Sequence, residues 1–149
     1  MKRVAALKPL SMDHHHGLAL ARKAKMAASD EKIQNADQLN IWTELLTHAE
    51  NVLISHFAIE ESYLAAALKA LDDPHVDQLV DRLYTEHETL RRLLSPSSAR
   101  NTANLKMLGE LLEQHIRFEE RELFEIAQMK LDDQTLQAIA AACSTKHGQ

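Results

Sequence analysis

The chain has 149 residues, a formal net charge of −5 at pH 7 and a single cysteine, Cys143. This length suits one domain, residues 1–149, with a real core. Mixed charges without a basic stripe argue against nucleic acid as a partner, and one cysteine excludes an internal disulfide or an all-cysteine iron–sulfur site. No apolar run is long enough for a membrane span or a secretory signal, so we expect a cytoplasmic protein that has no membrane partner.

The composition favours helix along nearly the whole chain. Only 3 glycines and 3 prolines interrupt it, and aromatic residues make up 4% of the sequence. The remaining residues are dominated by good helix formers, and no segment shows the period-two alternation of a half-buried strand. We therefore predict an all-α fold.

The first two predicted helices are separated by a polar segment. An extended lead-in, with Ser11 or Asp13 available as the N-cap, precedes a helix from about Asp13 to Ala28. Residues 29–40 are weakly patterned and are expected to form a loop or a frayed helix end. A long second helix then covers about Gln38 to Leu71.

Asp73 is the expected N-cap of a third helix, because the proline that follows it suits a first helical turn. This helix runs to about Leu94. The segment Ser95–Ser98 forms the next break, with a serine as the cap of a fourth helix that reaches about Met129.

A short final helix is expected to start at Asp132 or Asp133 and to pack across one end of the molecule. Four long helices joined by short breaks predict an antiparallel up-down four-helix bundle. Gly109 in the fourth helix has two interpretations. It either permits a close helix contact or is a weak spot that costs about 1 kcal/mol relative to alanine.

Two stretches share one plan, His-x-x-x-Glu-Glu, at His56–Leu64 and His115–Leu123. In each stretch a histidine and a glutamate lie four residues apart, so on a helix both side chains leave the same face. Leu45, Val52 and Ile59 continue the first face, which is therefore expected to point into the core. Burying an imidazole and a carboxylate is costly unless they bind something, and this cost predicts a metal site.

The other two long helices each carry a lone acidic-His step, Asp13-His14 and Glu86-His87. The chain thus contains a weak internal repeat of two helical hairpins with the same ligand plan, as a two-metal centre with approximate twofold symmetry requires. The helix 1 ligand is left open between His14 and His15, with periodicity favouring His14. The predicted metal ligands are His14 or His15, His56, Glu60, His87, His115 and Glu119.

Four imidazoles with two carboxylates match iron better than magnesium or calcium, which prefer oxygen ligands. The glutamates are expected to bridge the metals, so that each metal keeps two histidines and an open position for a small ligand. The remaining histidines with polar neighbours, His48, His75 and His147, are expected at the surface.

These residues resemble the bacterial-type hemerythrin-like (HHE cation-binding) proteins. The resemblance extends from Leu10–Leu18 through His56–Glu61 and Glu86–Arg91 to His115–Glu120. It implies a four-helix bundle that holds two iron ions as an oxo- or hydroxo-bridged pair. It also implies roles in reversible dioxygen binding, oxygen or iron sensing, and nitric oxide or peroxide handling.

The chain departs from the oxygen carriers of that family, which have His-x-x-x-His on the third helix. Here Leu83 and Arg91 flank His87 at four residues on either side. The missing imidazole argues against oxygen carriage and leaves dimetal binding as the expectation. Tyr63, Tyr84 and Glu122 are candidates to fill or tune the vacancy, although a core tyrosine with a bonded hydroxyl is the simpler reading of either tyrosine.

Three functions follow from this reading. The first is a di-iron protein that binds or senses a small diatomic ligand, peroxide or iron itself, with any output passed to a separate partner or through a homodimer. The second is a di-iron oxidoreductase that consumes peroxide or nitric oxide. The third is a structural or partner-binding bundle whose site is vestigial or holds zinc.

Overall fold

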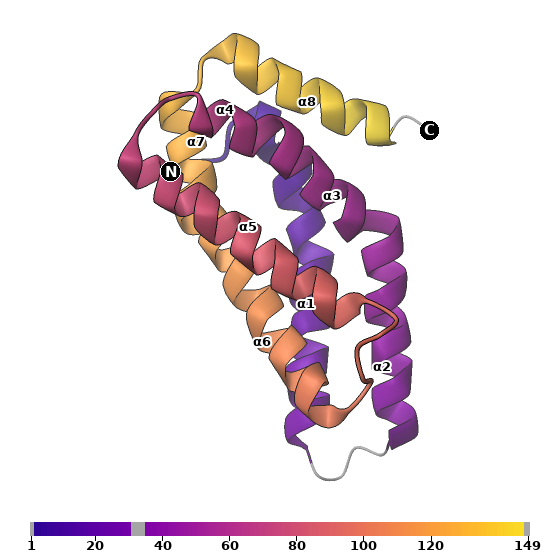
Figure 1. Cartoon of the computed structure of the whole chain (residues 1–149). Coiled ribbons are helices and arrows are strands. Elements are labelled where there is room, and N and C mark those ends of the chain that lie inside the picture. Colours follow the sequence, from indigo (N-terminus) through magenta and orange to yellow (C-terminus); the bar gives the residue numbers. More distant parts are fainter. Residues whose placement is uncertain (1, 31–34, 148–149) are drawn as a thin grey trace.

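The computed structural model describes residues 2–30 and 35–147, with side chains described as far as residue 145. All regular secondary structure in this part of the chain is helical (Figure 1). Four long helices form the bundle, and a fifth, α8 (Asp133–His147), lies along one end of it. The prediction of an all-α bundle with an additional C-terminal helix is confirmed.

Each long helix of the bundle except α1 and α5 is divided by segments with wider π-helical turns. The short η1 (Ala5–Leu7) precedes the bundle, whose first helix is α1 (Lys8–Ser29) and whose third is α5 (Pro74–Leu94). The second helix comprises α2 (Asn35–His48), η2 (Ala49–Leu53), α3 (Ile54–Ile59), η3 (Glu60–Ala65) and α4 (Ala66–Lys69). The fourth comprises α6 (Thr102–Phe118), η4 (Glu119–Leu123) and α7 (Phe124–Lys130).

The predicted start of the first helix is wrong. Helix α1 begins at Lys8 with Pro9 in its first turn, where the missing N–H of proline is harmless. Ser11 and Asp13 lie inside this helix, and their side chains bond other helices instead of capping their own. The second helix begins at Asn35, before the predicted Gln38, and the predicted loop at 31–34 lies outside the described residues.

The later helix ends are fixed by side-chain caps. The Asp73 carboxylate accepts hydrogen bonds from the N–H groups of His75 and Val76, as predicted. The expected serine cap of α6 is wrong, because Asn101 accepts the bond from the N–H of Asn104. Asp132 accepts from the N–H of Thr135 and so caps α8.

The π turns change which residues face the core. Each adds one residue to a helical turn, so an apolar stripe that follows α-helical spacing moves on by one position. Leu53, the last residue of η2, is buried, whereas the predicted core residue Val52 is only half-buried. Leu123 is likewise buried within η4, and the expected core residue Ile126 is half-buried.

Two apolar clusters fill the bundle, one toward each end. One contains Leu10, Leu64, Leu83 and Phe118, and the other contains Leu20, Phe57, Leu90 and Ile116. Each long helix passes from one cluster to the other. The polar residues that interrupt the core lie at this boundary, so they are enclosed by apolar side chains on both sides.

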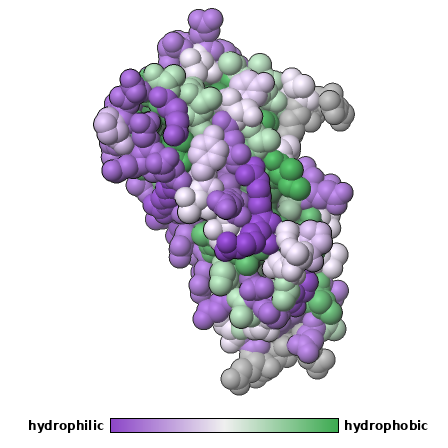
Figure 2. Space-filling view, viewed as in Figure 1, coloured by the Kyte–Doolittle hydropathy of each residue, from purple (hydrophilic) through white to green (hydrophobic). Residues whose placement is uncertain are grey.

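Within the described residues no helix is long and apolar enough to cross a membrane. Hydrophilic and hydrophobic residues are interspersed on the face shown in Figure 2.

Gly109 permits a close contact between α6 and α1. A Cβ atom at this position would lie 2.9 Å from the backbone oxygen of Ala21. We expect Gly109→Ala to destabilise the fold by about 1 kcal/mol, because forcing the helices apart costs more than the gain in helix propensity. Gly17→Ala is the matched comparison, since its Cβ would meet side-chain atoms alone, the flexible end of Ile116 at 3.0 Å and Nε2 of His48 at 3.8 Å. Urea unfolding of both variants checks this, and a Gly109→Ala protein as stable as the parent would contradict it.

Candidate metal centre

Six polar side chains meet at the boundary between the two apolar clusters. Each of the four long helices contributes a histidine, and the second and fourth helices each add a glutamate. All six side chains are buried, with Glu60, His87 and Glu119 fully inaccessible. We call this set the candidate centre: His14, His56, Glu60, His87, His115 and Glu119.

The candidate centre divides into two groups that share both glutamates. One ligand atom from each of His14, His56, Glu60 and Glu119 lies within 4.8 Å of all the others, and the same holds for Glu60, His87, His115 and Glu119. Each group therefore offers two imidazoles and two carboxylates. A glutamate that belongs to both groups can place one oxygen on each of two metal ions.

The individual contacts fit such bridging. One oxygen of Glu60 lies 3.1 Å from Nε2 of His56, and its other oxygen lies 3.1 Å from Nε2 of His87. Oε1 of Glu119 lies 2.8 Å from Nε2 of His115 and 3.3 Å from Nε2 of His14. Glu60 thus reaches from the first hairpin to the second, and Glu119 reaches back from the second hairpin to the first.

A carboxylate outside the centre holds the Nδ1 atom of each imidazole. Asp13 binds His56 at 3.0 Å and Glu86 binds His115 at 2.8 Å. Glu61 binds His87 at 2.6 Å and Glu120 binds His14 at 2.7 Å. The arrangement repeats the twofold plan of the sequence, because the first two pairs each lie within one hairpin and the last two pairs each join the two hairpins. We call these four residues the outer carboxylates.

The outer carboxylates fix the tautomer and direction of each imidazole. An Nδ1–H that donates to a carboxylate leaves the Nε2 lone pair free to bind a metal. Although these buried atoms lie close together, the Nε2 atoms of all four histidines and both oxygens of Glu60 and Glu119 have no hydrogen-bond partner among the described residues. Orphaned buried polar atoms of this kind are costly, and metal ions between them would satisfy all of them.

Charge inside the centre changes the pKa values of its members. Burial lowers the pKa of His56, but the Glu60 and Asp13 carboxylates outweigh it and raise this pKa to about 9. Burial raises the pKa of Glu60, yet the neighbouring His56 and His87 hold it well below its usual range. Burial keeps the pKa of His115 below its ordinary value. Glu60 is therefore a charged carboxylate at neutral pH, as a metal ligand must be, and a metal ion that binds His56 displaces the proton from its Nε2 atom.

The structure brings together His14 and the five other predicted residues but leaves His15 outside. His15 is exposed and belongs to neither group, whereas His14 is 4% exposed. His75 is exposed as predicted, and the side chain of His147 lies outside the described residues. The expectation that His48 is a surface residue is wrong, since it is 4% exposed.

None of the residues considered for the missing third-helix imidazole enters the centre. Tyr63 and Tyr84 are 46% and 41% exposed, so the expectation of core tyrosines is wrong. Glu122 pairs with Arg82 at 3.4 Å on the surface. Arg91 points away from the centre, and its guanidinium Nη1 atom forms an ion pair with Oε2 of the outer carboxylate Glu61 at 2.8 Å.

Sequence reasoning identified the acidic-His steps but not what the acids do. Asp13 and Glu86 precede a lone histidine, and Glu61 and Glu120 follow a candidate bridging glutamate. Each acid is the neighbour in sequence of one centre residue, and it holds an imidazole from a different helix. The sequence signal that could have predicted the outer carboxylates was an acidic residue next to a centre residue, repeated at four positions.

We expect Asp13→Asn to weaken one bound ion and spare the other. An amide supports the His56 imidazole less well than a carboxylate, and loss of such support lowers metal affinity by about 10- to 100-fold. Only the group that contains His56 is affected. Anaerobic ferrous iron titration against a chelator measures both affinities, with Asp81→Asn, an exposed aspartate, as the control. Unchanged affinity of the first group would contradict the proposed support.

Comparison with curated proteins and with solved structures gave no significant match. Comparison with protein families matches residues 5–127 to the hemerythrin HHE cation-binding domain. The match includes the six residues of the candidate centre and the four outer carboxylates, and it ends before α8. The chain therefore belongs to the hemerythrin HHE cation-binding domain family.

Proposed function

We propose that the candidate centre holds two iron ions and that this protein binds or senses a small ligand there, such as dioxygen, nitric oxide or peroxide. One observation carries the proposal. Four imidazole Nε2 atoms and four carboxylate oxygens converge in two groups that share Glu60 and Glu119, and the part of the chain that the structure describes offers them no hydrogen-bond partners. A pair of ions bridged by these glutamates accounts for the whole arrangement.

The donor set supports iron among the available cations. Imidazole suits iron, zinc, copper and nickel, whereas magnesium and calcium prefer oxygen ligands. Two bridging carboxylates with two imidazoles per ion supply four protein donors to each group. Iron takes up to six ligands, so this set leaves positions for a bridging oxygen and for an exogenous ligand.

The surroundings of one group support a ligand of small size. A cavity of about 450 Å³, lined in part by Leu53, Ile54 and Leu94, has the ring of Phe57 in its wall. That ring is stacked on His87, with centroids 4.0 Å apart. A single aromatic side chain thus separates an apolar cavity from a histidine of the centre. We propose that a diatomic ligand reaches the centre from this cavity when the Phe57 side chain moves.

The proposal is tested by reconstituting metal-free protein anaerobically with ferrous iron and then admitting air. We expect about two irons per chain, because each group provides a full set of donors, and near-ultraviolet absorption of an oxo-bridged ferric pair. A protein that binds no iron under these conditions would overturn the proposal and leave a structural bundle. Mg²⁺ added in the same way is the control and is expected to remain unbound.

The same preparation distinguishes a binding protein from an enzyme. Nitric oxide and hydrogen peroxide are added to the iron-loaded protein, and their concentrations are followed with electrodes. We expect about one ligand bound per di-iron centre and no further consumption, because each small ligand occupies an open position. Steady consumption that requires the loaded centre would establish an oxidoreductase instead.

A further inference from the structure

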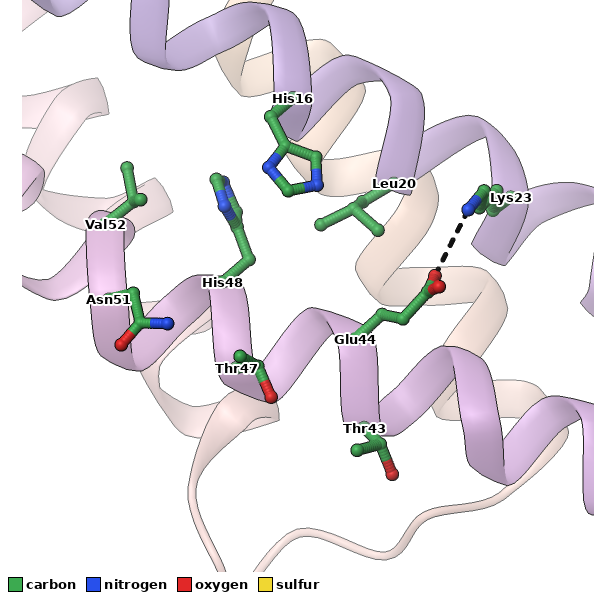
Figure 3. A pocket seen from close by; sticks show the side chains of 9 residues that line it. All are labelled: His16, Leu20, Lys23, Thr43, Glu44, Thr47, His48, Asn51 and Val52. Atoms are coloured by element: carbon green, nitrogen blue, oxygen red, sulfur yellow. Dashed lines mark hydrogen bonds and ion pairs between the residues drawn. The ribbon is translucent and has the colours of Figure 1, made fainter.

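A second histidine cluster lies between α1 and α2, separate from the candidate centre. It lines a cavity of about 470 Å³ that includes none of the six centre residues. Figure 3 shows this α1–α2 cavity, with His16 and Lys23 on α1 facing Glu44 and His48 on α2. Its polar groups have no part in the function proposed above.

The two imidazoles of the cavity have the spacing of a pair that shares one ion. The ring centroids of His16 and His48 lie 4.6 Å apart with the planes inclined at 57°. Two imidazoles that bind one ion at about 2.0–2.1 Å, with an angle of about 90° to 109° between the bonds, place their ring centres about 4.5–5.2 Å apart. Figure 3 shows both rings entering the space between the helices. The separation of the two rings is therefore compatible with one shared cation.

A third donor is available on the same helix face. Glu44 precedes His48 by four residues, the same separation as in the His–Glu pairs of the candidate centre. Its carboxylate pairs with Lys23 at 3.3 Å, and both side chains are about half exposed. Exposed ion pairs of this kind contribute little to stability, so a cation on the two imidazoles can draw Glu44 away from Lys23.

We propose that His16, His48 and Glu44 form a mononuclear site for a divalent transition-metal cation in the α1–α2 cavity. Two imidazoles and one carboxylate select zinc, copper, nickel, cobalt or ferrous iron over magnesium and calcium. His48 is buried and holds a fixed position, whereas His16 is exposed and open to solvent. Water completes the coordination on the open side of the cavity.

The test counts Zn²⁺ ions per chain by calorimetric titration of metal-free protein. His16→Gln is the main variant, because this exposed side chain can change without disturbing the core. His15→Gln is the matched control, since His15 is its exposed neighbour outside the cavity. We expect His16→Gln to bind one ion fewer than the parent, or to bind that ion at least about 10-fold more weakly, and His15→Gln to match the parent.

Two further variants test the carboxylate. Glu44→Gln is expected to weaken the same ion, and Lys23→Gln is expected to strengthen it, because Lys23 no longer competes for Glu44. Equal Zn²⁺ binding by His16→Gln and His15→Gln would overturn the proposal. Unchanged affinity in Glu44→Gln would remove Glu44 from the ligand set. These differences do not depend on the candidate centre, so failure of the di-iron proposal leaves this test intact.

Discussion

Glu119→Gln is expected to lower the bound iron from about two ions per chain to less than about one, because a metal site fails when a charged ligand becomes a neutral amide. Glu119 belongs to both groups of the candidate centre, so both ions lose a donor. His14→Gln provides the contrast. His14 belongs to one group only, and this variant is expected to keep about one iron per chain in the other group.

Metal analysis after anaerobic reconstitution distinguishes these outcomes, and circular dichroism verifies that each variant is helical. Glu122→Gln is the control, because this exposed glutamate lies three residues further along the chain and pairs only with the surface residue Arg82. Two irons retained in Glu119→Gln would contradict bridging by this residue. Equal iron loss in Glu119→Gln and His14→Gln would show that the two groups do not fill independently.

Ferrous iron is expected to raise the melting temperature of the metal-free protein by about 10–20 °C. An ion at 100 times its dissociation constant stabilises the folded state by about 2.7 kcal/mol, so two ions contribute about 5 kcal/mol. For a domain near 150 residues, each kcal/mol raises the melting temperature by about 2–4 °C. The buried atoms of the centre gain partners only when metal binds, so the unfolded chain competes weakly for the ions.

Anaerobic thermal unfolding followed by circular dichroism measures this shift. Mg²⁺ at the same concentration is expected to leave the melting temperature unchanged, because imidazole donors do not suit it. The double variant His56→Gln, His115→Gln lacks one imidazole in each group and is expected to show little shift with ferrous iron. If ferrous iron left the melting temperature of the parent protein unchanged, this result would contradict metal binding by the folded protein.

The spacing of residues predicted which side chains gather in the core, while their role as metal ligands stays a prediction. His-x-x-x-Glu places both donors on one helical face, and the repeat of this plan indicated the facing of two hairpins. The structure brings His56, Glu60, His115 and Glu119 together as this pattern implies. Such predictions succeed because they depend on geometry within one helix turn, which the sequence determines directly.

Features that depend on neighbouring helices were harder to predict from the sequence. The π turn of η2 moves burial from Val52 to Leu53, and no sequence pattern located this turn. His48 is flanked by polar residues, yet packing of α2 against α1 buries it. The direction of Asp13 likewise depends on where His56 lies, 43 residues away in the chain. Tertiary packing determines the η2 turn, the burial of His48 and the direction of Asp13, so local sequence propensity alone could not predict them.

The exchange of donors between the hairpins determines when the protein can acquire metal. The first hairpin carries His14, His56 and Glu60, but its group is completed by Glu119 from the fourth helix. The second hairpin carries His87, His115 and Glu119 and requires Glu60 in the same way. A partly synthesised chain that ends before the fourth helix therefore holds neither group. We therefore expect complete donor sets for both ions only after the whole bundle has formed, because a chain truncated before the fourth helix keeps three donors of the first group and two of the second.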